Sequence, residues 1–426
     1  MKNLFAIRRL RQFGRADEGQ ALVLGALALV VLMLMAGLGV EVGFLRYQKQ
    51  QMQKAADAAA IAGASELIYG TPALAIVAAR NDAAANGFTN GNNGITVSVN
   101  IPPQSGPFTG DSSYVEVIVA QLQPSYFVAV GGYSAVNVRG RAVASSMGSA
   151  SGCIYALDPT DPGSLVAAGS VAITSNCGIR VNSSSGSAFE KTGSGNIDVN
   201  YGGVGVVGGV YEQGSGSISP PPVTGIPPFI DPLAGLPAPT VGNCTYTGKQ
   251  TIQLSGPVPN GVYCGGISIA TSGTVTFSGL YILLGGISVA GTYSPTLTGS
   301  NVTFYNTGNT TYQYAPVAIT GSSSTALYAP TSGSLAGILF FQDRSIVGYC
   351  CGPATVNTFD GSRGELYTGA LYFPTTPISY TGNATYPPYT IIDAWQVKMV
   401  GTSAIKNNYT SLESGASPIS SAVLVE

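Results

Sequence analysis

The chain has 426 residues and unusually few charges. Lys, Arg, Asp and Glu together make up 9% of it, whereas about a quarter of an average soluble protein is charged, and 57 residues are glycine. The formal net charge of −2 argues against nucleic acid as a partner. Because the sequence has no histidine, Ser-His-Asp and Cys-His nucleophiles and histidine-containing zinc sites are excluded.

The first predicted element is a transmembrane helix. Residues 21–40 are uncharged and mostly apolar, and a helix of this length spans about 30 Å, the hydrocarbon thickness of a bilayer. Cations are more numerous in residues 1–20 than in the twenty residues after the span, so we expect a basic cytoplasmic N-terminus. A cleaved signal peptide is an alternative, but its apolar core is usually shorter. A prepilin leader is another, but Gly14 and Glu18 miss its spacing by one residue.

The helical pattern continues past the apolar run. Residues 41–70 contain no proline and are rich in alanine, so we expect the helix to leave the bilayer as a stalk of several turns. Glu41 closes the span, and we expect its carboxylate to remain hydrated at the outer headgroup level. Small residues at Ala55, Ala59 and Gly63 would permit close helix–helix contact, although high helix propensity explains them equally well.

A specific pattern covers residues 19–67. It has a Gly before the span, Leu-Gly-Val-Glu-x-Gly at its end and Gln-x-Ala-Ala-Asp-Ala-Ala-Ala beyond it. The matching positions include Gly19, Glu41, Gln53, Ala55, Ala56, Asp57, Ala58, Ala59 and Gly63. The pattern resembles the N-terminal region of TadE/TadG-like proteins of the Flp (Tad) pilus-assembly system, although Glu41 stands where that family more often has Asp. The resemblance implies a bacterial, membrane-anchored envelope protein that is not a catalyst, with other Flp/Tad pilus components as partners.

The rest of residues 41–150 is predicted to pack a helix on a small sheet, similar to a pilin-like or TadE-like domain. Pro72 begins a second helix that stops at Asn86-Gly87. Alternating apolar residues predict three strands, with a short helix between the last two; the strands cover residues 95–101, 114–123 and 135–145.

Two cations lie in the last of these strands. Arg139 and Arg141 alternate with apolar residues, so we expect both to point to solvent as edge charges. Binding of an acidic partner by this pair is the alternative.

Residues 151–426 are predicted to form a large all-β domain, which makes the fold class α+β. Gly265-Gly266-Ile267-Ser268-Ile269 recurs twenty residues on as 285–289, and Gly261-Val262-Tyr263 recurs eighteen residues on as 279–281. Short strands at a period near twenty favour a parallel β-helix, with a β-sandwich as the alternative. Proline-rich residues 218–242 are expected to leave the ladder as a connector. This connector separates first β-rich coils at 151–217 from a second β-rich domain at 243–426.

Six cysteines lie beyond the predicted span: Cys153, Cys177, Cys244, Cys264, Cys350 and Cys351. An even number on the exported side favours disulfides in an oxidising compartment. Separations close to one coil predict the pairs Cys153–Cys177 and Cys244–Cys264. Cys350 and Cys351 are adjacent, and they either form a vicinal bridge or remain free.

One concentration of charge in the C-terminal region is a candidate catalytic site. It consists of Asp343, Arg344, Asp360, Arg363 and Glu365. Lyases and hydrolases of polysaccharides need clustered carboxylates or a poised base, and this group is expected instead to form exposed ion pairs. We therefore expect no catalytic, cofactor-binding or metal-binding residues.

The leading hypothesis is a single-pass protein of the bacterial cell membrane, in contact with cytoplasmic membrane lipid, that resembles TadG. It would present a rigid extracytoplasmic β domain and contribute to Flp/Tad pilus assembly or anchoring. The alternative is a surface adhesin or glycan-binding module, because the 23 tyrosines offer faces that stack on sugar rings. A polysaccharide-active β-helix enzyme is a third hypothesis.

Overall fold

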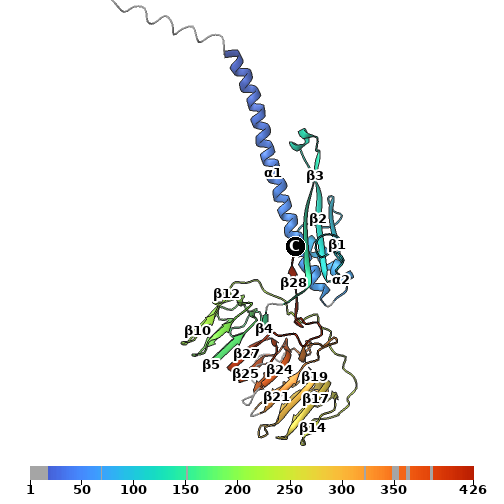
Figure 1. Cartoon of the computed structure of the whole chain (residues 1–426), viewed down its shortest axis with the longest axis vertical. Coiled ribbons are helices and arrows are strands. Elements are labelled where there is room, and N and C mark those ends of the chain that lie inside the picture. Colours follow the sequence, from blue (N-terminus) through green and yellow to red (C-terminus); the bar gives the residue numbers. More distant parts are fainter. Residues whose placement is uncertain are drawn as a thin grey trace, which may run out of the picture. The chain divides into compact units, whose positions relative to one another are not determined.

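The chain forms two compact units. The computed structural model describes residues 18–68, 70–149, 152–320, 323–347, 355–360, 365–383 and 387–426. One unit, here called the helical unit, comprises the chain up to Gly148 together with Ala422–Glu426. The other, the β unit, comprises Ser149–Ser421. Figure 1 shows the elements of both.

The helical unit contains two helices and a four-stranded sheet of order β1-β2-β3-β28. The elements are α1 (Glu18–Leu67), α2 (Pro72–Ala85), β1 (Ile95–Asn100), β2 (Tyr114–Pro124), the 3₁₀ turn η1 (Val128–Gly131), β3 (Ala135–Ser149) and β28 (Ser420–Leu424). Strands β1, β2 and β3 pair antiparallel in sequence, so the predicted helix-on-sheet arrangement is present. The last residues of the chain were expected in the second β-rich domain, but they extend the sheet of the helical unit instead.

Helix α1 is apolar and uncovered over its first half. It is long and apolar enough to cross a membrane, and the rest of the described chain buries none of its most apolar window. Helix α2 begins as the sequence predicts, because Thr71 caps it through its hydroxyl and Pro72 occupies its first turn.

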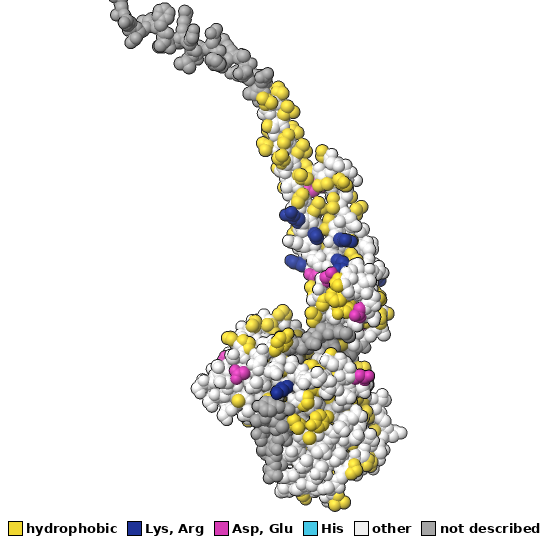
Figure 2. Space-filling model, in the orientation of Figure 1, with side chains coloured by type: hydrophobic (Ala, Val, Ile, Leu, Met, Phe, Trp, Pro, Cys, Tyr) yellow, Lys and Arg dark blue, Asp and Glu magenta, His cyan; other side chains and the backbone are white. Residues whose placement is uncertain are grey.

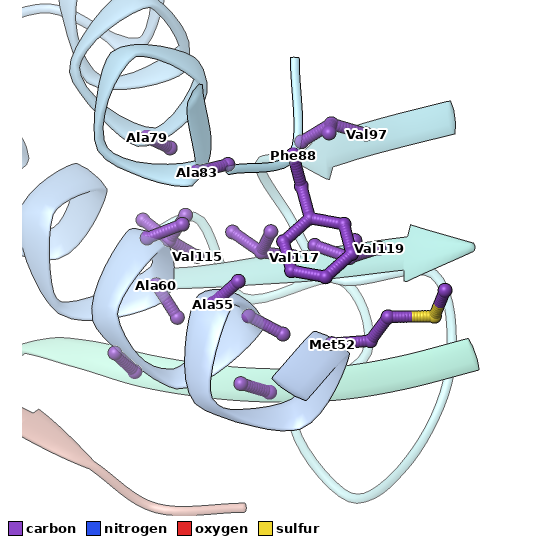
Figure 3. Close-up of a cluster of buried hydrophobic side chains, with 14 of the residues drawn as sticks. Met52, Ala55, Ala60, Ala79, Ala83, Phe88, Val97, Val115, Val117 and Val119 are labelled. Atoms are coloured by element: carbon purple, nitrogen blue, oxygen red, sulfur yellow. The ribbon is translucent and has the colours of Figure 1, made fainter. Parts of the chain in front are cut away.

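The second half of α1 is packed rather than free-standing. Its alanines lie against β2 and α2, and together with Phe88 and the inward valines of the sheet they form the core of the unit (Figure 3). The stalk is therefore part of the helix-on-sheet core. Small side chains permit this close approach of helix to sheet.

Two mostly parallel twelve-stranded sheets make up the β unit. The first has the order β10-β7-β5-β27-β25-β23-β20-β18-β16-β13, with β8 and β11 beside it. Its strands are β5 (Leu165–Ser175), β7 (Phe189–Thr192), β8 (Ile197–Val199), β10 (Val210–Gln213), β11 (Ile218–Ser219), β13 (Gln250–Ile252), β16 (Ile267–Ile269), β18 (Ile287–Val289), β20 (Ala318–Ile319), β23 (Asn357–Asp360), β25 (Ile378–Asn383) and β27 (Val397–Ile405).

The second sheet has the order β12-β9-β6-β4-β26-β24-β21-β19-β17-β14, with β15 and β22 beside it. Its strands are β4 (Gly152–Ala156), β6 (Gly178–Val181), β9 (Val204–Val206), β12 (Val223–Thr224), β14 (Gly256–Pro257), β15 (Gly261–Tyr263), β17 (Thr274–Leu284), β19 (Thr296–Thr307), β21 (Ser324–Tyr328), β22 (Ile338–Gln342), β24 (Glu365–Phe373) and β26 (Thr390–Ala394).

The chain reverses its stacking direction once within these sheets. From β4 to β12 the strands stack outward from the middle, whereas from β13 to β27 they stack from the opposite end back toward the middle. The two series meet where β26 pairs with β4 and β27 pairs with β5, both in parallel. The first coils and the later ones therefore share the same two sheets.

The sequence repeat near residue 267 matches the register of the sheet. Ile267, Ser268 and Ile269 pair with residues 287–289, twenty residues on. The eighteen-residue repeat of Gly-x-Tyr does not match the register, because Gly261 pairs with Tyr281 and not with Gly279. Apolar residues that face inward, such as Val275 and Phe277, are buried.

Aromatic rings form much of the core of the β unit. Phe304 packs on Phe277 and on Phe340 with ring centroids 5.2 and 4.8 Å apart, and Phe340 packs on Phe359 at 5.0 Å. Phe304 and Phe340 occupy paired positions of neighbouring strands and stack face to face, whereas Phe277 and Phe359 meet them edge to face.

The proline-rich segment leaves the sheets later than predicted. Residues 218–219 and 223–224 still pair, with β8 and β9 respectively. The chain leaves the ladders after Thr224, and Leu233 and Leu236 are then buried against the β unit. The segment is therefore docked along part of its length rather than suspended as a free connector.

Candidate functional site

The residues of the N-terminal sequence pattern meet in the helical unit. Glu41 is only 8% exposed. Its carboxylate accepts hydrogen bonds from the backbone N–H groups of Tyr126, Phe127 and Val128, at 2.6, 2.7 and 2.9 Å. The expectation that this carboxylate stays hydrated is wrong, because three N–H groups of the β2–β3 loop take the place of water. Glu41 thus fixes this loop to the helix.

A second contact between the same loop and α1 lies one turn earlier. The ring of Phe127 lies directly over Gly37, and a Cβ atom added at Gly37 would overlap it. The absence of a side chain at this position lets the ring approach the helix backbone.

Gln53 attaches the helix to β3. Its amide nitrogen donates to Asp57 Oδ1 and to the carbonyl oxygen of Arg141, both at 2.7 Å, and its amide oxygen accepts from the N–H of Arg141 at 3.2 Å. Gly140 permits this approach, because a Cβ atom there would lie only 2.5 Å from backbone atoms of Met52 and Gln53. The glutamine therefore pairs with the strand backbone as a neighbouring strand would.

The small residues of the pattern complete the contact. Ala55, Ala56 and Ala59 are fully buried, and a Cβ atom at Gly63 would lie 3.2 Å from both Ala75 O and Ala79 Cβ of α2. They do permit close helix–helix approach, and the partner helix is α2 of the same chain. Asp57 and Ala58 are half-buried, and Gly19 lies in the first turn of α1.

A buried ion pair lies on the other side of β2. Glu116 is fully buried and accepts hydrogen bonds from Asn100 Nδ2 (2.8 Å), Ser105 Oγ (2.7 Å), Gln104 N (3.1 Å) and Arg141 Nε (2.7 Å). Burial alone would raise the pKa of Glu116, but these hydrogen bonds outweigh it and lower the pKa to about 2.

Arg141 is not the solvent-facing edge charge that the sequence predicts. Its guanidinium binds both Glu116 and the Glu426 side chain, at 2.7 and 2.8 Å, because β28 covers the edge at which β3 was expected to end the sheet. Arg139 is exposed, as predicted. Sequence reasoning missed Glu116, because a carboxylate between two inward-facing valines alternates onto the opposite face and is usually solvated there.

A polar cluster holds the proline-rich segment on the β unit. Arg344 donates to the hydroxyl of Tyr372 at 2.7 Å and to the carbonyl oxygens of Leu233 and Leu236. The same hydroxyl donates to Asp231 Oδ2 at 2.6 Å. The cluster therefore explains why the segment is docked.

Asp393 lies beside this cluster and is completely buried. Burial, and then the neighbouring Asp231, raise the pKa of Asp393 well above its ordinary value, so its protonated form is favoured. The neutral form avoids the cost of a buried charge at this position, where neither carboxyl oxygen of Asp393 has a hydrogen-bond partner among the described residues.

Among the charged residues of the candidate catalytic site, Asp343 and Arg344 have different hydrogen-bond partners. Asp343 accepts from Thr307 Oγ1 at 2.6 Å and from Ser345 N at 2.9 Å, whereas Arg344 belongs to the cluster above. Asp360 lies in β23, and burial raises its pKa. Arg363 lies outside the described residues, as do Cys350 and Cys351, and the side chain of Glu365 is not described either. Within the described ranges, no three metal-ligating side chains gather in one place.

The β unit contains the two disulfides that the cysteine spacing predicts. Cys153 is bonded to Cys177, and Cys244 to Cys264, each with Cα atoms 5.6 Å apart. Both bonds join neighbouring coils. Strand β4 pairs with β6 beside the first bond, and an isolated parallel bridge joins Tyr246 to Tyr263, the last residue of β15, beside the second.

Many tyrosines of the β unit fill its interior rather than its surface. Tyr281, Tyr367 and Tyr372 are fully buried, and burial raises the pKa of Tyr314 to about 12. Tyr201 and Tyr211 are exposed, but they are not joined by any ring contact described for this unit. The tyrosine content therefore gives the adhesin hypothesis little specific support.

Comparison with known proteins agrees with the reading of the N-terminal pattern. No curated protein and no solved structure matched the chain. A family model described as "Putative Flp pilus-assembly TadE/G-like" matches residues 19–66. These are the residues that form most of α1, with its apolar half, Glu41, Gln53 and the buried alanines. The predicted resemblance is confirmed over this segment: residues 19–66 form a TadE/G-like region of the Flp pilus-assembly type.

Proposed function

We propose that the chain is a membrane-anchored envelope protein, resembling TadG, that contributes without catalysis to Flp/Tad pilus assembly or anchoring. The family match over residues 19–66 carries this proposal. The matched segment joins an uncovered apolar half-helix to a half-helix packed in a small domain. An apolar helix of this length that the chain itself does not cover is stabilised by lipid.

In this proposal the N-terminus is cytoplasmic and both units lie on the far side of the cytoplasmic membrane. The charge bias across the span supports this orientation. The two disulfides support it as well, because such bonds persist in oxidising compartments and are rare in the cytosol.

The β unit is proposed to be a parallel β-helix that presents a rigid surface to other pilus components. Its parallel sheets, the register near twenty residues and the stacked rings support this reading. Disulfides between neighbouring coils add rigidity. A rigid body held at the membrane by one helix suits a scaffold or anchor rather than a catalyst.

Two matched double variants test the anchor. Leu29→Arg with Leu32→Arg places charges in the uncovered half of α1, whereas Leu74→Arg with Val77→Arg places them on exposed positions of α2. We expect the first pair to release the chain from the membrane fraction and the second to leave it there, because a charge at the centre of a span costs about 3 kcal/mol on insertion scales.

Deletion of the gene tests the assembly role. We expect fewer or no Flp-type pili, restored by the native chain and by the α2 double variant but not by the α1 double variant. Normal piliation in the deletion strain would contradict the assembly role, even if the anchor were confirmed. Glycan binding by the full chain together with normal piliation would favour the adhesin.

A further inference from the structure

We propose that the tip of the β2–β3 hairpin, residues 122–134, inserts into the lipid headgroup region beside α1 and forms a second membrane contact. This inference rests on the proposed anchoring of α1 in a bilayer. The hairpin tip would then add to the anchor by holding the helical unit at a fixed depth and tilt.

The surface of the tip is apolar and aromatic. Leu122, Tyr126, Val130 and Tyr133 are 64–77% exposed, and Phe127 is 40% exposed. No charged residue occurs between Glu116 and Arg139. Figure 2 shows hydrophobic side chains at this end of the helical unit, next to the apolar half of α1, while the Lys and Arg side chains on the visible face lie farther along. A soluble protein rarely exposes such a cluster unless another phase or molecule covers it.

Two contacts fix the level of the tip along α1. Phe127 packs on Gly37 and the neighbouring backbone binds Glu41. Residues 21–40 are apolar over about 30 Å, the hydrocarbon thickness, so Gly37 lies about 5 Å inside its outer boundary. A ring that covers Gly37 therefore reaches the acyl chains, and the rest of the tip lies at the headgroups.

The backbone of the tip is prepared for an environment with little water. Unpaired N–H groups are costly in lipid, and Glu41 accepts from three consecutive N–H groups there. Ser125 N donates to Ser134 O at 3.0 Å, and Ser125 Oγ donates to Tyr133 O at 2.6 Å, which closes the base of the loop. The carboxylate of Glu41 thus serves a loop whose backbone would otherwise need water.

Helix α1 has the side chains of a membrane interface at the same level. Phe44 and Tyr47 are exposed about one and two turns beyond Glu41, and the cations Arg46 and Lys49 are exposed next to them. Aromatic residues gather at membrane interfaces, and cations beyond them reach the phosphates. Together with Tyr126 and Tyr133, these side chains form an aromatic belt contributed by two separate elements.

Depth-dependent fluorescence quenching tests the proposal on the full chain. Tyr126→Trp and Val130→Trp are made separately and reconstituted into phosphatidylcholine vesicles whose acyl chains carry bromine near the carbonyl end or near the methyl end. Leu74→Trp is the matched control, because Leu74 is 52% exposed on α2 of the same unit. The next residue, Ala75, lies against Gly63, which is about 39 Å farther along α1 than Gly37. The native chain contains a single tryptophan, Trp395, and its fluorescence is subtracted from that of each variant.

We expect both tip variants to be quenched several-fold more than Leu74→Trp, and more by the shallow bromines than by the deep ones. If the chain does not float with the vesicles, the anchor itself is wrong and the inference falls with it. If the chain floats but the tip variants are quenched no more than the control, the anchor stands and the inference is wrong. Two further results would overturn the inference. Quenching at Leu74→Trp as strong as at the tip would mean that the signal is not specific to the tip. A tip tryptophan with blue-shifted emission but no quenching would mean that protein, and not lipid, covers the tip.

Discussion

Glu116 makes the stability of the helical unit depend on pH. Its pKa lies at about 2 in the folded chain, against an ordinary value of 4.5, because its hydrogen bonds outweigh the effect of burial. Each tenfold change in an ionisation constant is worth about 1.4 kcal/mol, so the bound carboxylate contributes about 3 kcal/mol above pH 4.5. That contribution is lost as the pH falls from 4.5 toward 2, since the unfolded chain then binds a proton that the folded chain resists.

Amide hydrogen exchange of β2 in the full chain measures this effect. After correction for the intrinsic exchange rate, we expect protection to fall about a hundredfold between pH 6 and pH 2. Glu116→Gln should lower protection at pH 7 and remove most of this pH dependence, whereas Glu66→Gln, at an exposed position of α1, should change neither. An unaltered pH profile in Glu116→Gln would refute the reasoning.

Three further changes follow from the packing. Gly140→Ala should cost about 1–3 kcal/mol in urea unfolding, because its Cβ meets the α1 backbone, whereas Gly39→Ala, where an added Cβ meets nothing, should be tolerated; equal effects would contradict the close approach. Phe340→Ala should destabilise the β unit by about 3–5 kcal/mol, measured by denaturant midpoint, and a loss below about 1 kcal/mol would mean that the ring stack contributes little. Replacing Cys153 and Cys177 together by Ser should lower the free energy of unfolding of the β unit by about 3 kcal/mol, measured by denaturant midpoint. If reduction of the native chain left the midpoint unchanged, the disulfides would not stabilise the unit.

Local signals predicted the elements of the helical unit well. Pro72 and Asn86 mark the ends of α2 within a residue or two, and period-two alternation locates β1, β2 and β3. The long-range partners were not predictable from these signals. Glu41 looks like a hydrated charge at a span end, and its three donors lie 85 to 87 residues away in sequence.

In the β unit, repetition at twenty residues predicted parallel stacking because paired positions such as Ile267 and Ile287 carry similar residues. The reversal of stacking direction could not be predicted, because no sequence repeat relates the strands that meet there. Nothing in the residues around Ile154 indicates that their neighbour is Ile392 rather than an adjacent segment. Likewise Arg344 reads as one member of a local ion pair, and its carbonyl partners lie more than a hundred residues earlier.

The reversal of the chain within the β unit places its first and last coils next to each other. Strand β4 begins just after β3, and β26 and β27, which lie beside β4 and β5, come shortly before β28 returns to the sheet of the helical unit. The β unit is therefore an insertion between two adjacent strands of the smaller domain. Insertions whose ends meet can be lengthened, shortened or exchanged without disturbing the host fold. Selection can thus vary the β unit among related chains while the helical unit is retained.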